Sequence, residues 1–402
     1  MFRSKSDSIK ILALFLHDCR YGERIRGDER RFLEVAKQFK SFGAKISVIE
    51  WFHSLQKSFC SEKIYDSIKI NPPKLKALWI PYTIFKAIFV SRKLKYDIIY
   101  AHNQDIPNML VGYTLKILFR KPLVVVFHWE YKLFEEGCLR NLKRGKKIFI
   151  SLLLLAVSLF IRKFIFPKID HCFTVTDAIK TQLINQMKLQ PEKVTVSGNG
   201  VDSNKFKPYD NIEKKYDVAY FGRIDFSQKG VDVLLKAWKE VVIQKIFSKL
   251  ILIGGFNSQE DYKQLVNMLT ELDLKGNVEF TGFVGDEEVV KLLNMARIFV
   301  LPTRFEGHPL ALLEAMSCGL ACIVSSAVPV IREYGNSYIC ISPDNYKELA
   351  DNILLLLNDD ERRMELSRTS RAQALKYQWS QVAEKEYELM VNLIWRSYGR
   401  IT

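Results

Sequence analysis

Glutamates and backbone amides in the second half of the chain have the types and spacing that bind a phosphorylated ligand. Glu306 lies just before a predicted helix, which should run from Pro309 to Cys318 and stop at Gly319. The start of such a helix presents unpaired N–H groups and a partial positive charge, which attract phosphate. Because proline has no N–H, the amides available for this role are those of Gly307, His308, Leu310 and Ala311.

A second set of candidate phosphate ligands lies in the stretch FGRIDFSQKG, which ends at Gly230. Arg223 offers a bidentate guanidinium and Lys229 a compact charge, so together they suit a diphosphate. Inside the predicted helix, the carboxylate of Glu314 can accept hydrogen bonds from two vicinal hydroxyls, as acidic residues do with ribose. A diphosphate with a ribose indicates a nucleotide. The spacing alone leaves open the alternative that these are ordinary surface charges.

Short apolar strands alternate with helical patterns along the whole chain, which predicts parallel sheets built from βαβ units. At 402 residues the chain is long enough for two such domains. We predict two doubly wound α/β domains, the first over residues 1–195 and the second over residues 196–378. A polar stretch just after this boundary, Lys205–Lys215, has the composition of an interdomain linker. In both domains, ligands should collect where the strands end.

Cysteine content and charge narrow the class of protein. The seven cysteines include no C-x-x-C pair, which argues against a disulfide framework and a zinc site and favours a reducing cytoplasm. The apolar run Ile9–Leu16 is too short for a signal peptide and fits a first strand better. Residues 1–200 hold 35 Lys and Arg against 17 Asp and Glu, whereas residues 201–402 hold 25 against 28. A basic excess confined to one half indicates contact with a polyanion or an anionic membrane.

Four motifs carry a resemblance to a known family. The stretches SGNGVDSNKF, GRIDFSQKGVDVLLKAW, VEFTGFV and EGHPLALLEAMSCG resemble, in order and spacing, the C-terminal half of the retaining glycosyltransferases of family 4. That family has the GT-B fold, in which two Rossmann-like domains face each other across a cleft. The first half is similar only in outline. The resemblance implies transfer of a sugar from a nucleotide diphosphate sugar to an acceptor, with retention of the anomeric configuration.

In the second domain, the resemblance assigns roles to the residues already singled out. It places Glu306 at the donor sugar, Glu314 on the ribose, and Arg223 and Lys229 on the diphosphate. Phe283 of VEFTGFV joins the donor-binding residues. The final segment, residues 379–400, resembles the helix that returns from the second domain to the first.

In the first domain, the resemblance implies that Gly27 lets the backbone approach the donor phosphates and that His128 joins the catalytic residues. Two departures weaken this part. Many members have paired glycines where this chain has RIRGDERRF, with Gly27 alone. Many also follow the histidine with aspartate, whereas Trp129 and Glu130 stand here.

The implied reaction depends on charge stabilisation by cationic side chains and the helix start, so no metal, cofactor or protein base is expected. The departing phosphate would help to remove the acceptor proton. The acceptor should be a saccharide or a lipid-linked saccharide. Two other functions remain open: a sugar-nucleotide epimerase of the same fold and, because of the basic half, a nucleic-acid-binding protein. The second lacks any recognisable RNA-binding motif, so no nucleic-acid partner is expected.

One apolar segment predicts peripheral attachment to an anionic membrane surface at the cytoplasmic face. Fourteen uncharged residues, Ile148–Ile161, are too few to span a bilayer, which needs about twenty. Together, Lys147, Ser151, Ser158 and Arg162 should form one narrow polar stripe on a wide apolar face. A second basic and aromatic candidate, Lys74–Lys95, should be interrupted by Pro81. The alternative is a wholly buried helix with a basic approach loop. The loop before this helix contains the basic residues Arg140, Lys143, Arg144, Lys146 and Lys147.

Overall fold

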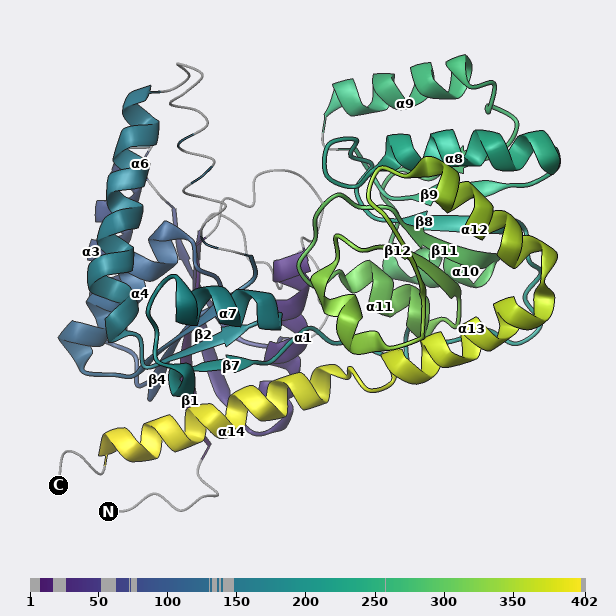
Figure 1. The fold of residues 1–402 in the computed structure, drawn as a ribbon. Coiled ribbons are helices and arrows are strands. Elements are labelled where there is room, and N and C mark those ends of the chain that lie inside the picture. Colours follow the sequence, from purple (N-terminus) through teal and green to yellow (C-terminus); the bar gives the residue numbers. More distant parts are fainter. Residues whose placement is uncertain are drawn as a thin grey trace. The chain divides into compact units, whose positions relative to one another are not determined.

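The computed structural model describes residues 8–16, 27–51, 63–71, 73, 78–129, 131, 136, 139, 148–256 and 258–398. The chain forms two compact units (Figure 1). The N-terminal unit comprises Met1–Gly198 together with Trp379–Thr402, and the C-terminal unit comprises Asn199–Gln378. Each unit contains one parallel sheet with helices packed against it.

Within the described part of the N-terminal unit, seven parallel strands form one sheet in the order β3-β2-β1-β4-β5-β6-β7. The chain therefore moves outward from β1 in one direction and then restarts at β4 on its other side. Ligands bind at such a switch point, beside the carboxyl ends of the strands. The strands are β1 (Lys10–Phe15), β2 (Lys45–Trp51), β3 (Asp66–Ile70), β4 (Ile98–Ala101), β5 (Leu123–Phe127), β6 (His171–Thr174) and β7 (Val194–Val196).

Alternation along these strands divides the N-terminal core into two layers. Leu12 and Leu14 of β1 belong to a core cluster against which α3, α4 and α6 pack, whereas Phe15 stacks on Phe32 of α1 on the other face. Helix α14 packs against α1. The helices are α1 (Gly27–Ser41), α3 (Trp79–Ser91), α4 (Ile106–Phe119), α6 (Ile148–Phe160) with its continuations η2 (Ile161–Ile165) and η3 (Phe166–Lys168), α7 (Asp177–Asn185), η4 (Pro191–Lys193) and α14 (Trp379–Tyr398).

The described residues of the C-terminal unit form a six-stranded parallel sheet in the order β10-β9-β8-β11-β12-β13, so its switch point lies between β8 and β11. The strands are β8 (Tyr216–Phe221), β9 (Leu250–Ile253), β10 (Val278–Phe280), β11 (Ala296–Leu301), β12 (Ala321–Ser325) and β13 (Ile339–Ile341). The helices are α8 (Val231–Gln244), α9 (Gln259–Glu271), α10 (Asp286–Asn294), α11 (Leu310–Ser317), η5 (Pro329–Tyr334), α12 (Tyr346–Asn358) and α13 (Asp360–Ala374). The predicted α/β class with doubly wound parallel sheets is confirmed.

Three local interpretations need correction. The stretch Lys205–Lys215 belongs to the C-terminal unit, where Asn294 bonds both the carbonyl of Lys207 and the amide of Tyr209, so its polar composition marks a surface loop. Pro81 does not interrupt α3, because it lies in the first turn, where its missing N–H has no helical partner. Helix α11 begins one residue later than predicted, because Pro309 has the extended ψ of 119° and serves as N-cap.

Candidate active site

The predicted phosphate ligands of the C-terminal unit come from two loops that leave neighbouring strands at the switch point. One loop connects β8 to α8 and carries Arg223 and Lys229, and the other connects β11 to α11 and carries Glu306. Strands β8 and β11 are paired and parallel, so both loops leave the same edge of the sheet. The fold thus brings together charged residues that are 77 positions apart in the sequence.

Lys229 and Glu306 form an ion pair across these two loops. Their side chains are only 14% and 13% exposed, so the pair is largely withdrawn from water. Gly230, which follows, holds φ at +67°, and a Cβ there would lie 2.2 Å from the carbonyl oxygen of Pro302. Only glycine allows this backbone contact, which fixes the loop before α8 against the loop before α11.

A network of backbone contacts holds the β8–α8 loop in shape. Asp225 accepts hydrogen bonds from the amides of Ser227 and Gln228, at 2.9 and 2.8 Å, which is the geometry of an Asx turn. The carbonyl of Gln228 then accepts from the amide of Arg304 at 2.8 Å and from the hydroxyl of Thr303 at 2.9 Å. The two loops are therefore joined through main-chain groups as well as through the ion pair of Lys229 and Glu306.

Arg223 and Arg304 differ sharply in their surroundings. Arg304 pairs with Asp232 at 2.8 Å and with Asp344 at 2.7 Å. These two carboxylates balance its charge and hold the loop in place. The side chain of Arg223 is 48% exposed and lies 4.0 Å from Asp225. It donates to the side-chain carbonyl of Gln228 at 2.9 Å. Arg223 is thus the guanidinium of the two that can turn toward an incoming anion.

The start of α11 is held by the side chain of His308. The amide of Asn199 donates to its Nδ1 at 3.1 Å, so Nε2 carries the proton and faces the hydroxyl of Tyr334 at 2.7 Å. The Asn199 side chain also donates to the carbonyl of His308 at 2.8 Å. The ring of His308 is therefore a structural support, and only its backbone amide suits the predicted phosphate role. Glu314 lies further along α11 and is buried.

Phe283, the remaining donor-binding prediction in this unit, follows β10 and is 52% exposed. Strand β10 lies two strands away from β8, but glycines bring their loops together. Gly254 holds φ at +138°, and a Cβ there would lie 2.0 Å from the carbonyl oxygen of Gly222. Gly254 also forms a β-bridge with Gly282. Close backbone packing therefore places the loop of Phe283 at the same edge of the sheet as Arg223.

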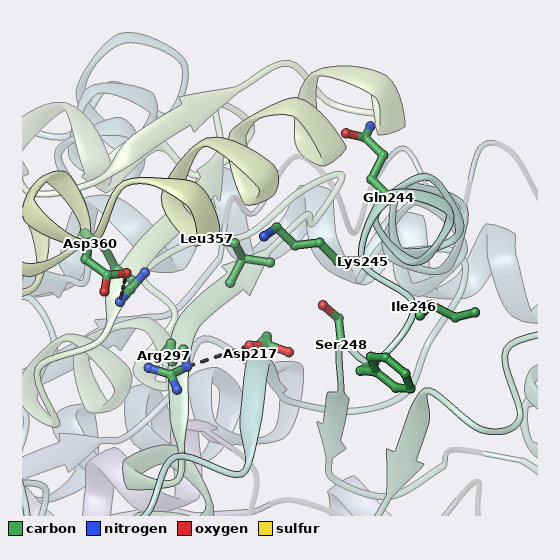
Figure 2. A pocket seen from close by; sticks show the side chains of 10 residues that line it. Asp217, Gln244, Lys245, Ile246, Ser248, Arg297, Leu357 and Asp360 are labelled. Carbon is green, nitrogen blue, oxygen red and sulfur yellow. Dashed lines mark ion pairs between the residues drawn. The ribbon is translucent and has the colours of Figure 1, made fainter.

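A hollow of the C-terminal unit lies at the opposite edge of its sheet, away from these loops. Figure 2 shows that it opens among Asp217 and Arg297, near the starts of β8 and β11, and Lys245, just after α8. Arg297 and Asp217 pair there at 3.7 Å. Strand starts are not where doubly wound sheets bind ligands, so we do not assign this hollow to the donor. Elsewhere, within the ranges that the structure describes, no three His, Cys, Asp or Glu side chains are grouped to hold a metal ion.

Two family models together match residues 25–373 of the chain. The model described as Glycosyltransferase Family 4 matches residues 25–205, and the one described as Glycosyl transferases group 1 matches residues 201–373. The chain belongs to glycosyltransferase family 4.

Curated relatives agree with this assignment. One is the N,N'-diacetylbacillosaminyl-diphospho-undecaprenol alpha-1,3-N-acetylgalactosaminyltransferase of Campylobacter jejuni, 25% identical over 78% of this chain and 83% of the relative. Another is the UDP-Gal:alpha-D-GlcNAc-diphosphoundecaprenol alpha-1,3-galactosyltransferase of Escherichia coli, 30% identical over 44% of each chain. Like them, this family 4 chain is a glycosyltransferase.

Solved structures show that the fold is GT-B. The Anabaena protein HepE, crystallised with UDP and glucose, matches with a TM-score of 0.74 at 20% identity, over 95% of this chain and 99% of that one. WaaG, a glycosyltransferase involved in lipopolysaccharide biosynthesis, matches with a TM-score of 0.70 at 15% identity, over 95% and 99% of the chains. At these identities the likeness shows the fold alone. The candidate site of the glycosyltransferase is defined by the residues of this chain.

In the N-terminal unit of the glycosyltransferase, the predicted residues His128 and Gly27 approach each other through His102. His128 follows β5, and its Nε2–H donates to the carbonyl of His102 at 2.9 Å. The Nε2 of His102 in turn contacts the carbonyl of Asp28, the residue after Gly27 at the start of α1. Burial lowers the pKa of His128 to about 4, so the ring is neutral near pH 7. Nδ1 is then the ring nitrogen without a proton.

The N-terminal unit also contains a buried ionic cluster that the sequence does not predict. Arg31 of α1 pairs with Glu386 of α14, and both side chains are fully buried. Arg31 also donates to the hydroxyl of Ser197 at 2.9 Å and to the carbonyl of Gly198 at 3.2 Å, while Tyr100 donates to Glu386 at 2.8 Å. The cluster connects α1 to α14 and to Ser197 and Gly198, where the stretch Met1–Gly198 of this unit ends. No local pattern reveals it, because Arg31 and Glu386 are 355 residues apart.

This cluster gives a stability prediction. Glu386→Ala should lower the free energy of unfolding by about 3–5 kcal/mol, because it leaves the buried guanidinium of Arg31 without its partner. The double variant Arg31→Met/Glu386→Met should lose much less, since no uncompensated charge remains. Urea unfolding of the N-terminal unit, followed by circular dichroism, measures both.

A matched control for this experiment lies on the same helix α1. Glu34 pairs with Lys37 at the surface, so Glu34→Ala should change the free energy of unfolding by less than about 1 kcal/mol. If the double variant were as unstable as Glu386→Ala, the lost stability would come from packing, and the proposed charge effect would be wrong.

The environment of Lys229 predicts how nucleotide binding depends on pH. Burial, and to a lesser extent the charge of Arg223, lowers the pKa of Lys229 to about 8, while Asp225 favours the charged form. Lys229 is therefore charged below about pH 8 and loses its charge as the pH rises. The affinity for UDP should fall by up to about tenfold per pH unit above this pKa, because binding then requires uptake of a proton.

Isothermal titration of UDP, from neutral pH to well above pH 8, tests this prediction. Lys229→Arg is the matched control, because its guanidinium keeps its charge throughout the range. The control should show a nearly constant affinity. The same decline in wild type and in Lys229→Arg would mean that another group titrates.

Proposed function

We propose that this glycosyltransferase moves a sugar from a nucleoside diphosphate sugar to a saccharide or lipid-linked saccharide acceptor, during synthesis of a cell-surface polysaccharide or glycolipid. The observation that carries the proposal is the largely buried pair of Lys229 and Glu306 beside Arg223, at the switch point between β8 and β11. A cation pair and a carboxylate at this position suit a diphosphate joined to a sugar.

The donor would lie along the carboxyl edge of the C-terminal sheet. Arg223, Lys229 and the first amides of α11 would bind the diphosphate, as helix starts bind phosphate. Glu306 would face the sugar, and Glu314 would accept from the ribose hydroxyls. The loop of Phe283 stands at the same edge, near the β8–α8 loop. In the N-terminal unit, Gly27 and His128 would provide contacts to the phosphates and the sugar.

The reaction would proceed with retention and without a protein nucleophile. The bond between the anomeric carbon and the β-phosphate oxygen breaks, and its electron pair stays on that oxygen. The acceptor oxygen bonds to the anomeric carbon on the same face, and its proton passes to the departing phosphate. Arg223 and Lys229 stabilise the negative charge that grows on the phosphate, and Glu306 the positive charge on the sugar ring. Since these cations supply the charge, activity should persist in EDTA.

The acceptor proposal rests on the relatives and on the charge of the chain. The printed names of the relatives from Campylobacter jejuni and Escherichia coli specify saccharides on diphospho-undecaprenol. An acceptor of this kind is held in the membrane, and the basic first half of the chain suits an anionic surface. We therefore place the enzyme at the cytoplasmic face of the membrane.

A donor panel with a membrane lipid extract as acceptor tests the function. Release of the nucleoside diphosphate together with labelled lipid supports the proposal, and the anomeric coupling constant of the product, measured by NMR, tests retention. An epimerised nucleotide sugar without a labelled acceptor would support the epimerase alternative. If no nucleotide sugar reacted and RNA bound instead, the nucleic-acid alternative would hold.

A further inference from the structure

Helix α6 turns its polar side chains inward and its apolar ones outward. Ser151 and Ser158 are 3% and 0% exposed, and Ser158 donates to the hydroxyl of Tyr131 at 3.1 Å. Phe149 and Leu153, in contrast, are 80% and 54% exposed. The polar stripe predicted from the sequence thus exists, but it faces the protein and not the solvent. This is the reverse of a helix that borders water.

The same apolar surface continues over two neighbouring helices. Phe85 and Phe89 of α3 are 65% and 52% exposed, and Ile117 of α4 is 56% exposed. Helix α3 packs against α4, and α4 packs against η2, which continues α6. All three helices also pack on the same core cluster of the N-terminal unit. We call this surface the three-helix face. Exposed apolar surfaces of this extent mark interaction sites.

The charged side chains within the helices of the three-helix face are all basic, and one of them, Lys116, pairs with Asp170, which follows the segment Ile148–Lys168. Helices α3 and α4 and the segment Ile148–Lys168 contain no Asp or Glu. Lys93 lies over the ring of Phe89 at 4.8 Å, and Lys163 over that of Phe164 at 5.4 Å. Lysines that run along aromatic rings and keep the ammonium at the edge are typical of an interface with lipid headgroups. The basic residues within these helices are Lys86, Lys116, Arg162, Lys163 and Lys168.

The segment Ile148–Lys168 is long and apolar enough to cross a membrane by length and composition, and only 22% of its most apolar window is buried. Its second part, however, is fixed in the protein, because Ile161, Ile165 and Phe166 are fully buried in the core cluster. The remaining helix α6, Ile148–Phe160, has 13 residues. At 1.5 Å per residue it reaches about 20 Å, less than the roughly 30 Å of a bilayer core.

We propose that the three-helix face inserts into one leaflet of an anionic bilayer, so that the enzyme lies on the membrane without spanning it. This inference rests on the proposed function, which places the acceptor in the membrane. It adds the surface by which the enzyme binds that membrane. The occupant is a lipid surface because both properties of the face, outward aromatic and aliphatic side chains and the basic side chains of its helices, match it. The basic residues Arg140, Lys143, Arg144, Lys146 and Lys147 lie outside the described residues and carry no part of the argument.

Flotation with vesicles tests the inference. The full chain should float with phosphatidylcholine vesicles that contain phosphatidylglycerol, and less with phosphatidylcholine alone or in high salt. The variant Phe85→Ser/Phe89→Ser/Phe149→Ser should bind at least about tenfold more weakly, because it removes three inserted side chains. The matched control is Ile243→Ser/Ile246→Ser/Phe247→Ser in the C-terminal unit, where these side chains are 66%, 68% and 90% exposed. The control should float like wild type.

Each outcome decides the question. Equal flotation of wild type and the three-helix variant would overturn the proposal. A wild type that stays with the protein fraction but forms a dimer, which the variant loses, would show that a second copy covers the face. Resistance of the bound protein to alkaline carbonate would indicate a spanning helix instead. The vesicles contain neither donor nor acceptor, so failure of the proposed sugar transfer would leave this result unaffected.

Discussion

The double variant Arg223→Ala/Lys229→Ala should lower the turnover number by about a thousandfold or more while the C-terminal unit stays folded. Removing a single oriented donor to a developing charge costs about a hundredfold to a thousandfold. Here both cations that we propose for the departing phosphate are lost, and the first amides of α11 remain as the other proposed donors. Nucleotide release with saturating donor and acceptor measures the effect, and thermal unfolding checks the fold.

The control for this variant uses cations at the other edge of the same sheet. Lys245 and Arg297 line the hollow of Figure 2, at the end of α8 and the start of β11. Lys245→Ala/Arg297→Ala removes the same number of positive charges from the unit, so it should keep nearly the wild-type turnover. Full activity in Arg223→Ala/Lys229→Ala, or equal losses in both double variants, would show that the donor phosphates are bound elsewhere.

Glu306→Ala should lower the turnover number by about a hundredfold and change the affinity for UDP far less. We expect this split because the proposed function places Glu306 at the sugar, which UDP lacks. The ion pair sharpens the expectation: without Glu306, Lys229 loses a partner that competes with the phosphates. UDP should therefore bind as tightly as to wild type, or more tightly. Initial rates and isothermal titration of UDP give the two quantities.

Two further variants separate charge from shape at this position. Glu306→Gln keeps the size of the side chain and should lose most of the same activity, because the negative charge stabilises the sugar ring as it becomes positive. Glu271→Ala removes an exposed carboxylate at the end of α9 and should leave both quantities unchanged. A Glu306→Ala variant that turned over normally but bound UDP weakly would place Glu306 at the nucleotide instead of the sugar.

Local patterns in the sequence were sufficient for the elements that carry the donor site. The spacing of Phe32, Val35, Ala36 and Phe39 predicts α1, and all four are buried in the structure. The prediction of α11 is correct apart from its first and last residues, since Gly319 adopts the left-handed φ of +77° that ends a helix. Such elements follow from periodicity and from residues with restricted backbone angles, which act within a few positions. The polar edge strand β3 gives only a weak signal in the sequence, because of its five residues only Ile70 is buried.

Tertiary structure alone decided which of these elements meet. The sequence identified Lys229 and Glu306 as candidate ligands, but only the pairing of β8 with β11 shows that they share one ion pair. It also found the polar stripe of α6 without revealing that Ser151 and Ser158 face inward, because a helical period specifies two faces and not which one is covered. The buried pair of Arg31 and Glu386 left no sequence signal at all. Contacts between residues so far apart in the sequence depend on the packing of the whole chain. A sequence pattern reflects only interactions between residues a few positions apart.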